Sequence, residues 1–392
     1  MNSLHIITNN SPTIFSLAGL EIRWYSLLFA LGFILGQPLG YYIFKREGKS
    51  LKDIDAITLH LILGTVIGAR LGHVLFYDFA YYSQHPLEAI LPISFTAHGL
   101  RFIGYRGLAS HGAVAGITLA LYIYLHYHIK ISLWPPKLQV RKQTRPGQSY
   151  LWLVDRIVIL VALGGCFIRM GNFMNEEILG KPTQSTYGVV FTHGVGQQLL
   201  KSHRGIDSVK VRKRPGAAFT QTGHSYPPVD MIIQFKKSGF SEHELRRFLE
   251  HKVKNMLAYN TQISQHIYEP AGSLSYELSV NDRGAYVAHI ATAAIPRHPA
   301  QLYESLSCLL LFFILFLWWY RAGVKLRPGS TIGFFFVYVF GLRFFYEFIK
   351  EGKVVLGSVL PWHVGQWLSI PLVFIGTALL WHASRQSQHS EV

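Results

Sequence analysis

Long apolar runs alternate with polar segments along this chain, and the runs have the length of membrane-spanning helices. A transmembrane helix needs roughly 20 predominantly apolar residues. Seven stretches approach or reach that length, at 24–44, 54–77, 108–128, 153–174, 302–320, 332–349 and 364–383. The pattern predicts an all-α polytopic membrane protein with about seven transmembrane helices.

One polar segment, 175–296, separates the fourth and fifth apolar runs. It contains a helix start with Ser241 as N-cap and Glu244 at the third helical position, and short strand-like runs at 229–235 and 285–290. We expect a small α+β extracytoplasmic domain here. The predicted division of the chain is therefore 1–174 with spans one to four, 175–296 as the outer domain, and 297–392 with spans five to seven and a cytoplasmic tail.

The positions of Lys and Arg predict the orientation in the membrane, because cytoplasmic loops are enriched in these residues. They gather in the links after the first, third and fifth runs, at Lys45, Arg46, Lys49, Lys52, Lys130, Lys137, Arg141, Lys142, Arg145, Arg321, Lys325 and Arg327. The N-terminus is thus expected outside and the C-terminus in the cytoplasm. The first 20 residues contain no Lys or Arg, so the first run is expected to stay as an anchor.

Composition supports a membrane protein and excludes several other classes. Of the 392 residues, 50% are hydrophobic and 15% are charged, against about 25% charged in soluble domains. The net charge of +16 falls largely in the predicted cytoplasmic links, so nucleic-acid binding is not predicted. Cys166 and Cys308 both lie in apolar runs, which excludes a disulfide-rich scaffold.

A few polar side chains lie within the apolar runs or at their edges, where a charged residue costs about 2.5 kcal/mol or more. They are Arg70, His111, Asp155, Arg156, Arg169, Arg343 and Glu347. With spans alternating in direction, Asp155 lies near the inner face. The arginines at 70, 169 and 343, with His111 and Glu347, lie toward the outer leaflet.

Structural roles are also open for several of these residues. Arg343 and Glu347 are four positions apart and could pair on one helix. Arg70 could extend toward the outer headgroups. Asp155, with its neighbour, could form a cap at the inner interface, and His111 could pack at a glycine-rich helix crossing.

The arginines favour phosphate chemistry, because a guanidinium is always charged and binds phosphate through two N–H groups. A nearby histidine can accept a proton near neutral pH. The sequence has no HExxH, CxxC, GxSxG or GxxxxGK motif, so a zinc protease, a redox enzyme and a serine hydrolase are not predicted. We infer an enzyme acting on a lipid headgroup; the alternative is a transporter or lipid-binding protein without chemistry.

Motifs around these residues resemble those of a known family, the bacterial prolipoprotein diacylglyceryl transferases. The similar segments are 23–25, 68–77, 111–112, 169–180, 297–304, 343–347 and 365–371. In the family signature, an arginine, an asparagine, a glutamate and a final glycine correspond to Arg169, Asn172, Glu177 and Gly180. Seven segments in the expected order are far more specific than any one of them.

The resemblance implies transfer of the diacylglyceryl group of phosphatidylglycerol to the lipobox cysteine of a prolipoprotein, with release of glycerol phosphate. It implies no metal and no organic cofactor. The implied partners are phosphatidylglycerol and prolipoprotein signal peptides that carry a lipobox cysteine. The implied location is the bacterial cytoplasmic (inner) membrane, crossed several times, with the active site toward the outer leaflet.

The resemblance also implies roles for single residues. The expected catalytic set is Arg169 and Arg343, which would stabilise charge on the leaving phosphate, and His111 as a base for the thiol. An arginine-rich field that lowers the thiol pKa without a base is the alternative mechanism. Together with both arginines, the implied phosphatidylglycerol site contains Tyr25, Asn172, Glu177, Gly180 and Glu347. Gly180 is expected to let the chain turn into the outer domain.

The chain departs from the family pattern at a few places. Ile168 stands where the family usually has glycine, and Val339 stands where a tyrosine is expected, with Tyr338 displaced by one position. The segment 181–296 is longer than expected and receives no chemical role. Its histidines show no HxxxH or HxH spacing, so no metal site is predicted there.

Overall fold

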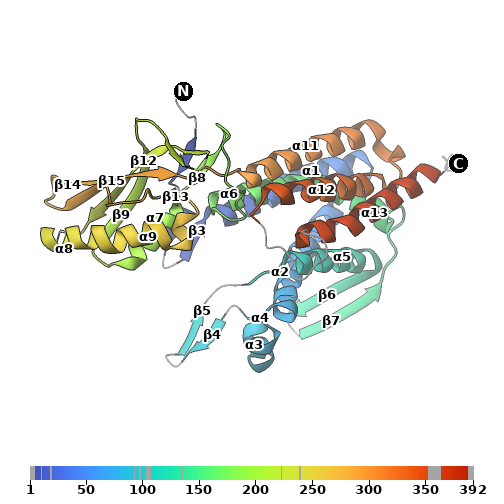
Figure 1. The fold of residues 1–392 in the computed structure, drawn as a ribbon. Coiled ribbons are helices and arrows are strands. Elements are labelled where there is room, and N and C mark those ends of the chain that lie inside the picture. The colour runs from blue at the N-terminus through green and yellow to red at the C-terminus, as the bar shows by residue number, and fades with distance from the viewer. Residues whose placement is uncertain are drawn as a thin grey trace. The chain divides into compact units, whose positions relative to one another are not determined.

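The computed structural model describes residues 5–9, 11–17, 20–91, 93–96, 99–102, 107–133, 136–221, 223–237, 240–351 and 363–386. The chain divides into two compact units, and several long helices contribute to both (Figure 1). The first unit comprises Met1–Leu31, Gly165–Leu310 and Tyr338–Val373. The second comprises Gly32–Gly164, Leu311–Val337 and Phe374–Val392.

Long helices form at the apolar runs. They are α1 (Trp24–Arg46), α2 (Leu51–Phe76), α5 (Ser110–His126), α6 (Tyr150–Met174), α11 (Ala300–Ala322), α12 (Ser330–Ile349) and α13 (Val364–Arg385). Within the described ranges, six helices are long and apolar enough to cross a membrane. The remaining long helix, α5, has 17 residues and ends where strand β6 (Tyr127–Leu133) begins. The predicted run 108–128 is therefore longer than the helix it contains.

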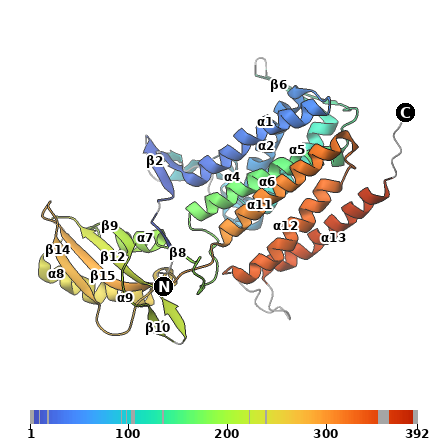
Figure 2. The same ribbon diagram turned by 90° about the horizontal axis from the view of Figure 1, so that it is seen from above.

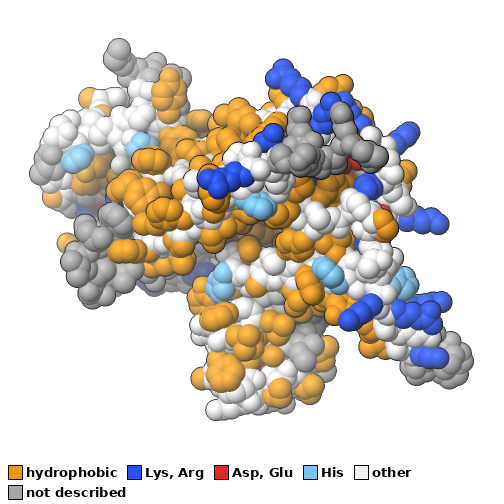
Figure 3. Space-filling view, turned by 90° about the vertical axis from the view of Figure 1, so that its right-hand side faces the viewer, with side chains coloured by type: hydrophobic (Ala, Val, Ile, Leu, Met, Phe, Trp, Pro, Cys, Tyr) orange, Lys and Arg blue, Asp and Glu red, His pale blue; other side chains and the backbone are white. Residues whose placement is uncertain are grey.

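Many large hydrophobic side chains on these helices point outward. Ile34 on α1, Leu59 on α2, Leu306 on α11 and Phe374 on α13 are all more than half exposed. Figure 3 shows hydrophobic side chains over much of the visible surface, with Lys and Arg restricted to a few clusters. Exposed apolar surface of this extent fits a polytopic membrane protein.

In the second unit, α2 and α5 cross at glycines. A Cβ at Gly68 would lie 2.8 Å from the Cα of Gly116, and a Cβ at Gly72 would lie 2.7 Å from the Cα of Gly112. Small residues at such spacing let two backbones approach closely in a membrane. The smaller elements of this unit are α3 (Phe79–Gln84), α4 (Pro86–Ile90), β4 (Ile93–Thr96), β5 (Gly99–Phe102), β7 (Pro136–Lys142) and a 3-10 turn at Gly323–Lys325.

The second unit also brings the cation-rich links together. The Arg46 guanidinium, at the end of α1, lies 3.9 Å from the ring centroid of Tyr320, near the end of α11. Arg145, in the link before α6, forms an ion pair with Asp53 at 2.8 Å, and Asp53 lies in the first turn of α2. The three links that the sequence assigns to one side of the membrane therefore meet in space.

Asp155 and Arg156 are structural residues beside these links. The buried Asp155 carboxylate accepts hydrogen bonds from the backbone N–H groups of Gly329 (2.6 Å) and Ile332 (2.9 Å), which caps the start of α12. Arg156 forms a buried ion pair with Glu47 at 3.0 Å. The predicted capping role of Asp155 is confirmed.

The first unit contains an α/β module within residues 189–294 (Figure 2). Its strands are β8 (Val189–Phe191), β9 (Ile206–Lys213), β10 (Phe219–Gln221), β11 (His224–Tyr226), β12 (Pro228–Phe235), β13 (Ile267–Tyr268), β14 (Tyr276–Val280) and β15 (Tyr286–Ala294). Its helices are α7 (His193–Ser202), α8 (Glu242–Arg247), a π-helical turn (Phe248–Val253), α9 (Lys254–Tyr259) and α10 (Thr261–Ser264).

The core of the α/β module lies between a sheet and its helices. The strand order is β13-β15-β12-β9, with β14 also paired to β15. Alternate residues of β12 are buried, as expected for a strand with one covered face. Met231 and Ile233 on β12 pack in a single buried cluster with Leu249 and Val253 from the helical segment. The predicted strands and the capping box at Ser241 are confirmed.

The N-terminal segment joins this module before it enters α1. Strand β1 (Ile6–Thr8) pairs in parallel with β8, and the Asn9 amide donates to the Val211 carbonyl at 2.8 Å. The hairpin β2 (Thr13–Leu17) and β3 (Leu20–Arg23) then leads to Trp24, the first residue of α1. The start of the chain and the segment between α6 and α11 are thus in direct contact.

Candidate active site

Most of the predicted site residues lie in the first unit, around a short segment that follows α6. The backbone N–H of Lys181 donates to the Ile349 carbonyl at 2.7 Å, and the N–H of Glu351 donates to the Leu179 carbonyl at 3.1 Å. The Gln301 side chain donates to the Glu177 carbonyl. These bonds hold segment 175–181 between the start of α11 and the end of α12.

Arg169 is anchored by a carboxylate on a neighbouring helix. Its Nε lies 3.1 Å from Oε2 of Glu304 on α11, and its side chain remains 25% exposed. The other oxygen of Glu304 pairs with the buried Lys350, which directly follows α12. The carboxylate thus lies between two cations, and its contact with Arg169 is an ion pair at Nε.

Asn172 and Glu177 face one another across the end of α6. The Asn172 amide donates to Glu177 Oε2 at 3.0 Å, and the backbone N–H of Glu177 donates to the Asn172 carbonyl at 2.9 Å. Tyr25 packs on Gly171, where an added Cβ would lie 2.8 Å from the tyrosine ring. The Tyr25 phenol lies within electrostatic range of Glu177 and Arg169. Four predicted site residues are thereby brought together.

Gly180 lies where two segments of the chain approach closely. Its φ is not in the left-handed region, so the chain does not need glycine for a turn here. Instead, a Cβ at Gly180 would lie 2.7 Å from the Cβ of His298. Its carbonyl accepts a hydrogen bond from the buried Arg297 at 2.9 Å. Glycine is required at this position because two chain segments approach closely.

Arg343 and Glu347 lie on α12 as a loose pair. The distance between Arg343 Nε and Glu347 Oε1 is 3.9 Å, and the arginine side chain is 40% exposed. A Cβ at Gly365 would collide with the Glu347 carboxylate, so the start of α13 lies directly against it. Lys350 is within electrostatic range of both Glu347 and Arg169. A tight internal salt bridge is therefore not the main role of Arg343.

His111 belongs to the second unit. It lies in the first turn of α5, its side chain is exposed, and its ring contacts Phe76 at 5.2 Å and Tyr77 at 5.8 Å between centroids. The predicted glycine-rich helix crossing is present, since His111 directly precedes Gly112. The ring itself stands at the edge of this crossing and is accessible.

Arg70 does not reach toward the headgroups. Its side chain is buried and donates to the backbone carbonyls of Glu88 (2.5 Å) and Ala89 (2.9 Å) at the end of α4. Its guanidinium also lies 4.6 Å from the ring centroid of Tyr82. The interpretation of Arg70 as a residue that extends to the membrane surface is wrong, because backbone carbonyls satisfy it inside the unit.

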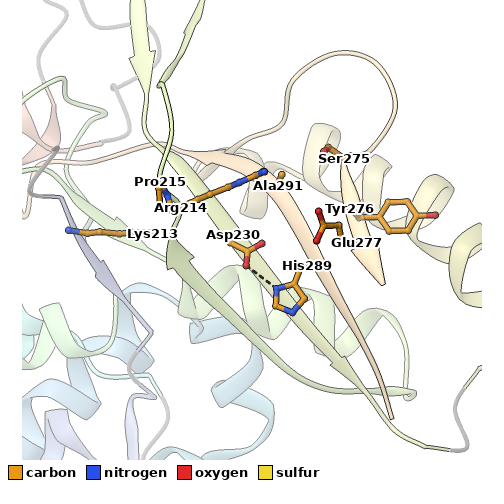
Figure 4. A pocket seen from close by; sticks show the side chains of 9 residues that line it. All are labelled: Lys213, Arg214, Pro215, Asp230, Ser275, Tyr276, Glu277, His289 and Ala291. Atoms are coloured by element: carbon orange, nitrogen blue, oxygen red, sulfur yellow. Dashed lines mark hydrogen bonds and ion pairs between the residues drawn. The ribbon is translucent and has the colours of Figure 1, made fainter. Parts of the chain in front are cut away.

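A separate polar hollow lies on the α/β module, where Asp230 forms an ion pair with His289 at 3.0 Å (Figure 4). The hollow has a volume of about 230 Å³ and is also lined by Lys213, Arg214 and Glu277. It contains none of the predicted site residues. Both acids and bases line it, so its charge selects no ligand class.

The sequence did not point to two charged residues near Arg169, which are Glu304 and Lys350. Glu304 falls within a family-like motif but had no role assigned, and Lys350 lies just beyond the sixth apolar run. Each is a charged residue at the edge of an apolar run. That position is the sequence feature by which both could have been found. Neither residue's partner is visible in the sequence, because Arg169, Glu304 and Lys350 come from three different helix ends.

Comparison with known proteins gives a consistent result. The model of the prolipoprotein diacylglyceryl transferase family matches residues 12–382. A relative from Chloroherpeton thalassium, named phosphatidylglycerol–prolipoprotein diacylglyceryl transferase, is 30% identical over 386 residues, covering 98% of this chain and 97% of the relative. Relatives with the same name from Tolumonas auensis and Bacteroides fragilis are 28% identical, covering 95% of this chain and 95% and 93% of the relatives. The chain belongs to the prolipoprotein diacylglyceryl transferase family.

Proposed function

We propose that this protein transfers the diacylglyceryl group of phosphatidylglycerol to the thiol of the lipobox cysteine in a prolipoprotein. The cysteine sulfur attacks the glycerol carbon that carries the phosphate. A C–S bond forms, the C–O bond to the phosphate breaks, and its electron pair leaves with glycerol phosphate. The reaction is the first step of lipoprotein lipidation, and the relatives named above carry the name of this activity.

The observation that carries this proposal is the way Arg169 is held. Glu304 forms an ion pair with the guanidinium at Nε, so the two terminal nitrogens point away from this carboxylate. One of them donates a long hydrogen bond of 3.5 Å to the Asn172 oxygen. An arginine fixed in this way is prepared to bind phosphate with two N–H donors. It would stabilise the negative charge that grows on the leaving phosphate.

Arg343 is the second proposed phosphate ligand. Its side chain is partly exposed, and its Nε has no hydrogen-bond partner among the described residues. Glu347, 3.9 Å away, orients it without closing a short bond. We assign Tyr25, Asn172 and Glu177 to the glycerol hydroxyls of the headgroup, because their polar groups lie together beside Arg169.

His111 is the proposed base that takes the thiol proton. Its ring is exposed, and histidine is the side chain that most often serves as a general base. The thiol is a poor nucleophile until it loses its proton, with a reference pKa of roughly 8.5. The alternative is that Arg169 and Arg343 lower the thiol pKa electrostatically. The pH dependence of a His111 variant distinguishes these two mechanisms, as described below.

We propose seven membrane crossings, with the N-terminus outside and the C-terminus in the cytoplasm of a bacterial inner-membrane protein. The pairing of β1 with β8 supports this topology. Because the two strands are in contact, the start and the end of segment 24–174 must lie on the same side of the membrane. An even number of crossings between them is then needed, and α1, α2 and α6 supply three. Helix α5, at 17 residues, is at the lower limit of spanning length and supplies the fourth.

The test is transfer to a synthetic lipobox peptide by membranes that contain the protein, with and without added phosphatidylglycerol. A mass increase of one diacylglyceryl group is expected only with the lipid. Arg169→Ala and Arg343→Ala should each lower the rate by about 100-fold or more, whereas Arg246→Ala, which removes an exposed pair on α8, should not. A headgroup-binding protein or transporter without chemistry would leave the peptide mass unchanged in every sample.

A further inference from the structure

The chain adopts a strained backbone on both sides of Glu177. Glu176 has a φ of 53° and Ile178 a φ of 55°, and they are the non-glycine residues with positive φ within the described ranges. A β-branched residue in this region is a genuine outlier. Such conformations are unfavourable and persist only where surrounding contacts enforce them. Glu177, a proposed headgroup ligand, is exposed between the two.

The contacts that enforce this backbone converge on the Glu176 carboxylate. One oxygen accepts a hydrogen bond from the Thr8 hydroxyl on β1 at 2.8 Å. The other accepts from the backbone N–H of His193 at 3.0 Å, at the start of α7. A carboxylate at a helix N-terminus is favoured by the helix dipole. Burial nevertheless raises the pKa of Glu176, with these hydrogen bonds opposing the rise.

Glu176 and Glu177 therefore face different partners. The Glu176 side chain binds the N-terminal strand and the α/β module, and the Glu177 side chain accepts from Asn172 at the end of α6. The left-handed residue Glu176 stands between these two sets of contacts, and Ile178 follows directly after Glu177. The bonds to Thr8 and His193 supply the compensating interaction.

We propose that Glu176 is a positioning residue, which clamps the left-handed turn to β1 and α7 and so presents the Glu177 carboxylate beside Asn172 to the glycerol part of the phospholipid headgroup. This inference rests on the proposed function. It also gives the long segment between α6 and α11 a role, because α7 and its sheet provide the fixed frame for the clamp. Strand β1 extends that frame toward α1, where Tyr25 lies.

The experiment uses the full-length protein and two substitutions of Glu176. They distinguish the effect of the strained backbone from the effect of the carboxylate's hydrogen bonds. Glu176→Gly removes the carboxylate but allows the left-handed conformation without a steric penalty. Glu176→Gln keeps the side-chain length and one acceptor oxygen. The matched control is Glu277→Gln, which changes an exposed carboxylate of the α/β module on β14.

Glu176→Gly should stay folded and raise the KM for phosphatidylglycerol at least fivefold, with little change in the KM for the lipobox peptide. Glu176→Gln should have an intermediate KM, and the control should match the wild type. Hydrogen–deuterium exchange of the 175–180 amides should be at least tenfold faster in Glu176→Gly. A merely structural residue would lower the amount of active enzyme and leave the KM unchanged.

An unchanged KM for the lipid in Glu176→Gly, with transfer by the wild type intact, would overturn the inference while leaving the proposed function in place. Unchanged amide exchange across 175–180 would overturn it independently of activity. A wild-type protein that transfers nothing would instead overturn the proposed function, and the inference with it. The three results are distinguishable because the first is a KM of the variant, the second is the amide exchange of the variant, and the third is the transfer activity of the wild type.

Discussion

The Glu304 carboxylate is shared by two cations, Arg169 on one oxygen and Lys350 on the other. Its side chain is only 7% exposed, so water screens these interactions poorly. Removing the negative charge would leave two positive groups facing one another in a buried place. Glu304 is therefore important for the direction of the Arg169 guanidinium as well as for local stability.

We expect Glu304→Gln to lower the transfer rate at least tenfold, because the neutral amide no longer fixes Arg169. The loss should persist when rates are compared at equal amounts of folded protein. Glu242→Gln is the control, since it breaks an exposed ion pair with Arg246 that contributes little. A rate within twofold of the wild type would show that Arg169 does not need this carboxylate.

His111→Gln tests how the thiol loses its proton. Without a base, the reaction depends on the thiolate already present, which rises about tenfold per pH unit below the thiol pKa of roughly 8.5. The variant should therefore be slow at pH 7 and gain rate steeply toward pH 9, while the wild type changes less. If both proteins show the same pH profile, the arginine field and not His111 activates the thiol. The profile is measured with the lipobox peptide and saturating lipid.

The sequence was sufficient to identify the arginines of the candidate site. It was not sufficient to identify the residues that contact them. Arg169 and Arg343 stand out because charge is rare in apolar runs, and the motif around Arg169 also indicated Asn172 and Glu177. The strain at Glu176 could not be inferred, because glutamate has no preference for a positive φ. It becomes visible only when Thr8 and α7 are placed around it.

At the level of elements, the crossing of α2 and α5 depends on glycine on both helices. Gly64, Gly68 and Gly72 face Gly112 and Gly116 so closely that added Cβ atoms would overlap the opposing backbone. Lipid gives helices no hydrophobic reason to associate, so close backbone packing supplies much of the attraction. His111 lies at the end of this contact and depends on it for its position.

Gly116→Ala should destabilise this helix pair by about 1–3 kcal/mol, the usual cost of overpacking, because its Cβ would lie 2.8 Å from the Cα of Gly68. Gly164→Ala is the control: it lies in α6, and a Cβ there has nothing within 4 Å. Thermal unfolding in detergent should show a lower Tm for the first variant. The second should unfold at the wild-type temperature or above. Equal Tm values for both alanine variants would contradict the tight crossing.

Hydrophobic length predicted the helices well and their ends less well. The run at 108–128 exceeds α5 by two residues at each end: Leu108 and Ala109 precede the helix, and Tyr127 and His128 lie in β6. That strand is held by β7 across a hairpin, a pairing that depends on contacts beyond the apolar run. For β12, by contrast, the alternating pattern of apolar and polar residues was sufficient to predict the strand. A strand with one buried face repeats every two residues.

Across the whole molecule, charge and strand pairing lead to the same topology by independent routes. The cationic links contact one another through Arg46 and Tyr320 and through Arg145 and Asp53. The N-terminal strand pairs with the α/β module. In the proposed topology the first observation concerns the cytoplasmic side and the second the outer side, and each is consistent with a crossing by α5.

Single cysteine substitutions test this topology. They replace Ser16 on β2, Ser279 on β14 and Ser384 in the last turn of α13, whose side chains are all exposed. A membrane-impermeant thiol reagent on sealed spheroplasts should label Ser16→Cys and Ser279→Cys, and Ser384→Cys only after permeabilisation. The wild type, whose Cys166 and Cys308 are not exposed, gives the background. Four crossings separate Ser16 from Ser279 if α5 spans, and three if it does not. Labelling of these two positions from opposite sides would therefore remove α5 from the membrane, and labelling of Ser16→Cys only after permeabilisation would reverse the predicted orientation of the N-terminus.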